Sequence, residues 1–232
     1  MPSKRYIEVD LIRGIAILLM VAFHFSYDLN HFSYIDINIR SGLDWRYFRY
    51  LILTLFIMTV GISLVLANRK KINFKKVLLR SLKLLIASAL ITIVSYFMNP
   101  IMWIYFGVIH FILFGSLVGL LFVHRPYVSL VVGLSILILY NLGLANMHWL
   151  YNPLQDILHL PRHTEDLVQF VPWFGVLLIG IFVGHTKWYD WGIKSNQVSE
   201  SLSFLGQHAL IIYLIHQPIL FGIFELLNLL KH

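Results

Sequence analysis

Residues 10–31 read Asp10-Leu-Ile-Arg13-Gly-Ile-Ala-Ile-Leu-Leu-Met-Val-Ala-Phe-His24-Phe-Ser-Tyr-Asp28-Leu-Asn-His31. The apolar part of this stretch is long enough to cross a membrane, since a helix of about 20 residues spans the hydrocarbon core. Arg13, His24 and Asp28 interrupt it. Ionisable groups are costly at membrane depth and persist there mainly where they face protein or water. The stretch therefore predicts a membrane-spanning helix with a functional polar face.

The composition of the whole chain is that of an integral membrane protein. Of its 232 residues, 59% are hydrophobic and 12% charged, and the mean hydropathy is +0.77. One soluble core could not bury so much apolar surface. The absence of cysteine excludes disulfides and thiolate chemistry. The formal charge of +7 comes from basic residues in loops, which is typical of membrane orientation. We therefore expect the lipid bilayer, and not nucleic acid, as a partner.

Seven stretches have the length and apolarity of membrane-spanning helices. They predict an all-α, polytopic membrane helical bundle, in which residues 1–232 form a single transmembrane domain without internal repeats. The expected spans are 10–30, 48–67, 79–98, 102–123, 127–145, 168–185 and 205–229.

The distribution of Lys and Arg predicts the orientation of this bundle, because cytoplasmic loops carry an excess of basic residues. Twelve basic residues fall on the side of the N-terminus and five on the other side. The N-terminus is therefore expected in the cytoplasm, in a multi-pass protein of the cell membrane. The twelve are Lys4, Arg5, Arg69, Lys70, Lys71, Lys75, Lys76, Arg80, Lys83, Arg125, Lys187 and Lys194; the five are Arg40, Arg46, Arg49, Arg162 and Lys231.

The spacing of polar residues in the first span predicts one chemical face. Arg13 and His24 are eleven residues apart, close to three turns, and Asp28 and His31 continue the stripe. Asp10 extends it toward the cytoplasm. Arg13 and His24 would stand roughly 16 Å apart along the axis, which suits a long ligand with an anionic part at Arg13 and a reactive end near His24. The alternative is that Arg13 anchors the helix at the interface and His24 bonds a neighbouring helix.

Two further histidines are expected at similar depth. His110 lies in the fourth span and His216 near the middle of the seventh, so that both could converge with His24. Tyr213 and Gln217 flank His216. Pro218 frees the carbonyl of the preceding turn, which suits a helix that lines a cavity.

The outer loop 147–167 offers a competing pattern, His159-x-x-x-His163, with Asp156 and Glu165 nearby. This spacing binds metal when both histidines lie on one helix. Pro161 lies between them and disrupts such a helix. We therefore expect no metal and interpret the loop as the lining of an outer vestibule or as a solvated connection.

Five short fragments occur in order along nearly the whole chain: Arg5-x4-Asp10-x2-Arg13-Gly14, Phe23-His24-Phe25-x2-Asp28-Leu29, Gly107-Val-Ile-His110, Pro172-Trp173-Phe174-Gly175, and Leu205-Gly206-Gln-His208-x4-Tyr213-Leu-Ile-His216-Gln217-Pro218. Together they resemble the bacterial branch of the heparan-α-glucosaminide N-acetyltransferase family. The Arg13-x10-His24 spacing is also similar to that of wider membrane acyltransferases that modify surface polysaccharides, where the histidine is thought to be catalytic.

The resemblance implies an acyl-CoA-dependent N- or O-acetyltransferase. Its donor would be cytoplasmic acetyl-CoA or a similar acyl-CoA, and its acceptor an amine or hydroxyl of a glycan or lipid-linked amino sugar. His24 would act as general base with Asp28 fixing its tautomer. The residues that it implies as catalytic are His24, Asp28, His31 and His216, and those near the donor are Arg13, Asp10, His110, Tyr213, Gln217 and Trp173.

Some differences from the family leave alternatives open. The lysosomal enzyme is larger, has a lumenal domain, and places an asparagine where this chain has His24, so that His31 is the second candidate for the catalytic base. Heparan itself is not expected as the acceptor of so short a chain. The alternative function is a membrane transporter or proton-coupled permease, which would also carry intramembrane His and Asp. A homodimer is compatible with the sequence.

Overall fold

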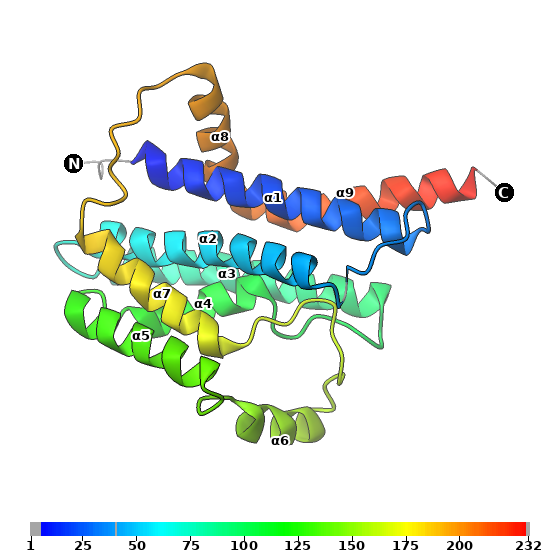
Figure 1. Ribbon diagram of the computed structural model, residues 1–232, viewed down its shortest axis with the longest axis horizontal. Coiled ribbons are helices and arrows are strands. Elements are labelled where there is room, and N and C mark those ends of the chain that lie inside the picture. The colour runs from blue at the N-terminus through cyan, green and yellow to red at the C-terminus, as the bar shows by residue number, and fades with distance from the viewer. Residues whose placement is uncertain (1–5, 40, 231–232) are drawn as a thin grey trace. The chain divides into compact units, whose positions relative to one another are not determined.

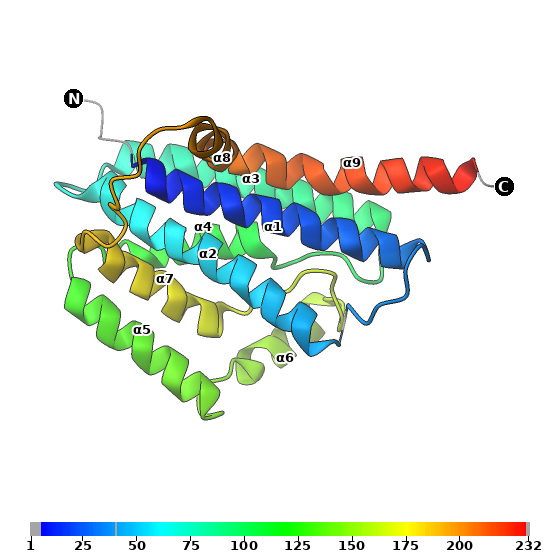
Figure 2. The ribbon, with the colours of Figure 1, turned by 45° about the horizontal axis from the view of Figure 1, so that its top comes forward.

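The computed structural model describes residues 6–39 and 41–230, and the regular secondary structure in these ranges is helical throughout (Figures 1 and 2). This confirms the all-α prediction. Lys4, Arg5, Arg40 and Lys231, which entered the prediction of orientation, lie outside the described residues. The helices are α1 Ile7–His31, α2 Leu43–Asn68, α3 Phe74–Met98, α4 Val108–Gly119, α5 Pro126–Asn141, α6 His148–Leu158, α7 Phe170–His185, α8 Gln197–Gln207 and α9 Ala209–Leu229.

Four of the described helices, α1, α2, α3 and α9, are long and apolar enough to cross a membrane. They coincide with four of the expected spans. The spans expected at 102–123, 127–145 and 168–185 correspond to the shorter apolar helices α4, α5 and α7, of 12, 16 and 16 residues. The number of seven spans and the cytoplasmic N-terminus stay predictions.

Two expected boundaries were wrong. The span expected from residue 102 becomes helical only at Val108, because the backbone before it bonds residues 165–168: the Met102 carbonyl accepts from the Glu165 N–H at 3.0 Å, and the Phe106 carbonyl accepts from the Val168 N–H at 3.1 Å. The span expected at 205–229 is broken at His208, whose φ/ψ of −101°/14° is not helical. The first part belongs to a separate amphipathic helix, α8.

The loop 147–167 contains α6, a helix that the sequence did not predict. It ends at Leu158, and His159 adopts the left-handed conformation with φ of 52°. The segment 159–163 is therefore not helical, as Pro161 indicated. Gln155 ties α6 to the segment before α4, because its Nε2 donates to the Tyr105 hydroxyl at 3.1 Å.

The described residues group into two compact units. The first unit, residues 57–189, holds the end of α2 and the helices α3 to α7. Its core is apolar and includes the fully buried side chains of Phe111, Leu177 and Ile181. Ser129 on α5 donates to the Leu178 carbonyl of α7 at 2.6 Å, which ties these two helices together where they pack.

The second unit, residues 6–56 and 190–230, holds α1, the start of α2, α8 and α9. Gly14 on α1 and Gly206 on α8 lie where the two helices touch: a Cβ on Gly14 would overlap the Leu202 carbonyl, and one on Gly206 would overlap the Asp10 carbonyl. Only glycine permits this backbone approach. Further along α1, a core cluster joins the start of α2 to α1 and α9. It contains Ala16, Ile17, Met20, Ile52, Phe56 and Ala209. The polar face of α1 is thereby fixed against α8 and α9.

Candidate functional site

The centre of the candidate site is a pair of histidines from α1 and α9. The rings of His24 and His216 lie 4.9 Å apart between centroids, at an interplanar angle of 62°. His216 is buried, with 8% of its surface exposed. The structure therefore brings together two of the three histidines that the sequence predicts to converge.

The hydrogen bond of His216 fixes its tautomer. Its Nδ1 lies 2.7 Å from the Tyr213 carbonyl oxygen. A carbonyl can only accept, so Nδ1 carries the proton and Nε2 of the neutral ring keeps its lone pair. The backbone of α9 thus holds His216 with a basic nitrogen available.

Asp28 is fully buried one turn beyond His24, with 0% of its surface exposed. Its Oδ1 accepts a hydrogen bond of 2.8 Å from Nε2 of Gln217. Asp28 therefore orients Gln217, the neighbour of His216. Asp28 was expected to fix the tautomer of His24. Among the described residues no hydrogen bond joins these two side chains, because the Asp28 carboxylate points from α1 toward α9.

Three polar atoms of this group are buried and lack a hydrogen-bond partner within the described part of the chain: Asp28 Oδ2, His216 Nε2 and Gln217 Oε1. Buried polar atoms are normally paired, and an unpaired one costs free energy. Their occurrence on three neighbouring residues indicates a position where water or a substrate group binds.

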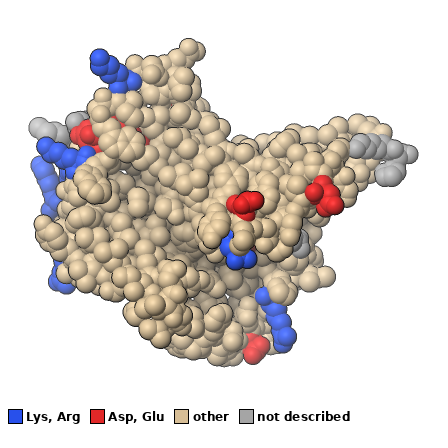
Figure 3. Space-filling view, viewed as in Figure 1, with Lys and Arg blue, Asp and Glu red and all other residues tan. Residues whose placement is uncertain are grey.

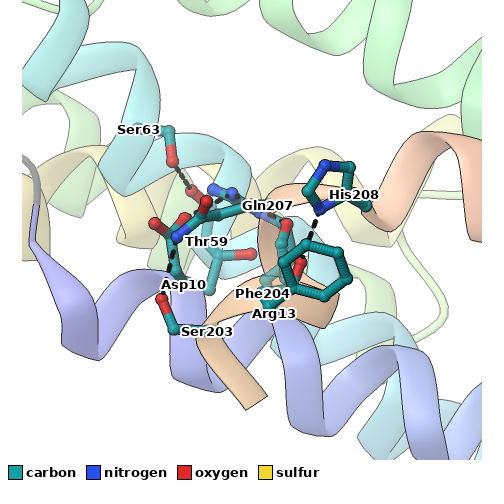
Figure 4. Close-up of polar contacts among 9 residues, drawn as sticks. Asp10, Arg13, Thr59, Ser63, Ser203, Phe204, Gln207 and His208 are labelled. Carbon is teal, nitrogen blue, oxygen red and sulfur yellow. Dashed lines mark hydrogen bonds and ion pairs between the residues drawn. The ribbon is translucent and has the colours of Figure 1, made fainter. Parts of the chain in front are cut away.

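Toward the start of α1, Arg13 forms an ion pair with Asp10, with Nη1 3.0 Å from Oδ1 (Figure 4). The same nitrogen donates to the Gly206 carbonyl at the end of α8, at 3.4 Å. The exposed fraction is 23% for the Arg13 side chain and 7% for that of Asp10. Arg13 is therefore held by the last turn of α8, whose carbonyls form the negative end of the helix.

The face predicted on α1 is confirmed, since Arg13, His24, Asp28 and His31 all contact the segment from α8 to α9. His31 is the most exposed of the four, and its ring packs against Phe221 at 5.6 Å between centroids. It lies at the end of α1, beyond the His24–His216 pair.

His110 and Trp173 belong to the other compact unit, residues 57–189. His110 Nε2 lies 3.1 Å from the Thr92 hydroxyl, and its Nδ1 accepts from the Gly107 N–H at 3.2 Å. His110 therefore caps its own helix. Trp173 lies in the first turn of α7.

Asp166, which sequence reasoning missed as an individual residue, completes the start of α4. Its Oδ2 accepts from the Val108 N–H at 3.3 Å, and a Cβ on Gly107 would lie 2.7 Å from the same oxygen. The sequence signal was the glycine of Gly107-Val-Ile-His110, which leaves room for a carboxylate.

The described residues contain no group of three or more His, Asp or Glu side chains arranged to hold a metal ion. His159 Nδ1 lies instead 3.3 Å from the Ile157 carbonyl of its own turn.

Comparisons with known proteins give one family. No curated protein and no solved structure matches the chain. Residues 5–218 match the family model described as heparan-alpha-glucosaminide N-acetyltransferase, catalytic. This range includes α1, the histidine pair and Gln217, and it covers most of the 232 residues. The chain therefore belongs to the family of heparan-α-glucosaminide N-acetyltransferase catalytic domains.

Proposed function

We propose that this protein is a multi-pass membrane acyltransferase that moves an acetyl or similar acyl group from acyl-CoA to an amine or hydroxyl of a glycan or lipid-linked sugar. The observation that carries the proposal is the His24–His216 ring pair, with unpartnered buried polar atoms on His216 and on its neighbours Asp28 and Gln217. The family membership supports acetyl transfer as the reaction. Residues 1–232 act in this proposal as one transmembrane acyltransferase domain.

In the proposed reaction, an imidazole removes the proton of the attacking acceptor. The nitrogen or oxygen of the acceptor forms a bond to the thioester carbonyl carbon, the carbon–sulfur bond breaks, and the proton passes to the departing thiolate. His24 is our candidate for this base. Its ring is not committed to a hydrogen bond among the described residues, whereas Nδ1 of His216 is.

His216 and Gln217 support the reaction from α9. The amide nitrogen of Gln217 is bound to Asp28, so that its position is fixed before substrate arrives. Pre-positioned dipoles stabilise developing charge without reorganising. We assign to this pair, with Tyr213 beside it, the polarisation of the thioester carbonyl or the alignment of the acceptor.

Arg13 is the candidate for binding the donor. A guanidinium binds phosphate or carboxylate with several N–H groups at once. Asp10 and the Gly206 carbonyl hold it in one orientation, which leaves less side-chain entropy to lose when donor binds.

Acetyl-CoA binding decides between this function and the alternative of a transporter. The purified chain in phosphatidylcholine nanodiscs is titrated with acetyl-CoA by calorimetry, and transfer of radiolabelled acetyl to a panel of amino sugars and lipid-linked sugars follows. Saturable binding with transfer is expected. Absence of acetyl-CoA binding, together with proton-coupled flux in proteoliposomes, would replace the enzyme by a permease.

A cytoplasmic donor bound at Arg13 needs the N-terminus on the cytoplasmic side, and the seven expected spans then place Lys70 inside and His159 outside. Single cysteines introduce specific labels, since the native chain has none. In intact cells an impermeant maleimide is expected to label His159→Cys and to spare Lys70→Cys. Labelling of Lys70→Cys from outside would reverse the orientation.

A further inference from the structure

The 57–189 unit contains a small pocket at the start of α3, and neither histidine of the pair lines it. It has a volume of about 90 Å³, room for several waters or one small anionic group, since one water needs roughly 10–15 Å³. The end of α2, the first three turns of α3 and the end of α4 line it. Its polar lining residues are Asn68, Lys76, Arg80, Ser81 and Ser116, and the remainder of the lining is aliphatic.

The polar side of the pocket is cationic. Lys76 and Arg80 are one turn apart on α3 and both line the pocket. Like charges at this spacing repel, and cations near a helix N-terminus oppose its dipole. The first turn of α3 contains no acidic residue. The arrangement is therefore unfavourable for the helix alone and favourable for an anion.

The sequence supplies no carboxylate to this region from its own neighbourhood. No Asp or Glu occurs between residues 45 and 155, although ten Lys and Arg do. Figure 3 shows several blue Lys and Arg side chains at the left edge of this face of the molecule.

A second, independent observation comes from α4. Ser116 is buried, with 7% of its surface exposed, and lines the pocket. Its Oγ has no hydrogen-bond partner among the described residues. A hydroxyl can donate to an anionic oxygen, which would satisfy this atom.

We infer that this pocket binds a phosphate group, with Lys76 and Arg80 as charged ligands and Ser116 as a neutral donor. Its aliphatic lining fits a phosphate that is attached to a chain with aliphatic segments. Two sources carry this chemistry: the phosphates of coenzyme A, followed by its pantetheine arm, and the head group of an anionic phospholipid. Only the first source rests on the proposed function.

The test compares variants that each remove one positive charge from α3, inside or outside the pocket. Arg80→Gln and Lys76→Gln remove cations that line the pocket, whereas Lys75→Gln and Lys83→Gln remove cations of the same helix that do not. Each full-length variant is reconstituted in phosphatidylcholine nanodiscs, and its melting temperature verifies the fold. If Arg80→Gln does not fold, Arg80→Lys, which keeps the charge and loses the planar fork, takes its place.

In the first arm, coenzyme A is titrated by calorimetry. In the second, the rise in melting temperature is measured when phosphatidylglycerol replaces a fifth of the phosphatidylcholine. Loss of a charge-assisted contact should weaken coenzyme A binding about tenfold, or remove the lipid-dependent rise, in the pocket variants alone. The arm that responds identifies the source.

Equal effects of the pocket and control variants in both arms, or no effect in either, would overturn the inference. Unaltered coenzyme A binding in Arg80→Gln and Lys76→Gln, with an unaltered lipid response, would do so while leaving the proposed function intact. Wild-type protein that binds no coenzyme A would instead contradict the proposed function, and the lipid arm would still decide the pocket.

Discussion

The two units of the chain differ in where they hold their polar side chains. In the 57–189 unit, two polar side chains act at helix ends: Asn73 begins α3, and Asp166 bonds the first turn of α4. In the second unit, His24, Asp28 and His216 lie within the apolar stretches of α1 and α9. Polar groups at helix ends satisfy the backbone and need no other role. Those inside a membrane helix cost free energy and require another explanation, and catalysis supplies one.

The largest expected effect tests the histidine pair. His24→Ala should keep the fold and donor binding and lose about two to four orders of magnitude in transfer rate, the usual contribution of a positioned base. His31→Ala should cost far less, because its exposed ring can be replaced by water. Single-turnover acetyl transfer by both variants measures the difference. If His31→Ala abolishes transfer and His24→Ala does not, the reactive centre lies at the C-terminal end of α1, at His31.

A smaller effect is expected from Asp28→Asn, because it preserves shape and removes charge. The hydrogen bond that Gln217 donates then has a neutral acceptor, or the Gln217 amide turns over to accept from the new side-chain amide. Charge-assisted bonds are roughly twice as strong as neutral ones. We expect a rate loss of about ten- to a hundredfold, between those of His31→Ala and His24→Ala. Gln217→Glu in the same assay removes the same hydrogen bond from the α9 side, because it replaces the amide donor by a second carboxylate. Wild-type rates in both variants would make the Asp28–Gln217 bond a purely structural contact.

The sequence predicted the α1 side of this comparison well, because helical spacing is regular. Arg13, His24, Asp28 and His31 were expected on one face, and each contacts α8 or α9. The pairing of His24 with His216 followed from equal depth in two spans. Spacing alone could not show that Asp28 would bond Gln217, since the partner lies 189 positions away in the chain.

The features that the sequence did not reveal depend on contacts between distant segments. The break at His208 separates an apolar helix from one whose Gly206 packs on the α1 backbone. The late start of α4 reflects bonds to residues 165–168. Residues 101–106 are apolar although α4 begins only at Val108, and only Gly206, Gln207 and His208 separate the apolar residues on either side of the second boundary, so that composition places both boundaries wrongly.

Arg13→Ala is expected to act mainly on donor affinity. An interaction that is equal in ground and transition state raises KM and spares kcat, and loss of one charge-assisted contact weakens binding about tenfold. The variant also leaves the Asp10 carboxylate without its ion pair, so Arg13→Lys serves as the control that keeps a cation. Steady-state kinetics with acetyl-CoA separate the two constants. Unchanged KM in Arg13→Ala would remove Arg13 from the donor site and make it an anchor of α8.

The smallest expected effect lies in the 57–189 unit. It tests whether a polar side chain at a helix end there affects stability alone. Asp166→Ala removes a carboxylate from the N-terminus of α4. A capping oxygen there contributes about 1 kcal/mol, and an anion interacts favourably with the positive end of the helix. The melting temperature in detergent should therefore fall, whereas the transfer rate per folded molecule should not change. Asp166→Asn keeps an oxygen acceptor and should shift less. Because polar groups at helix ends serve the backbone, loss of transfer in Asp166→Ala without loss of stability would show that this unit, too, contributes a catalytic carboxylate.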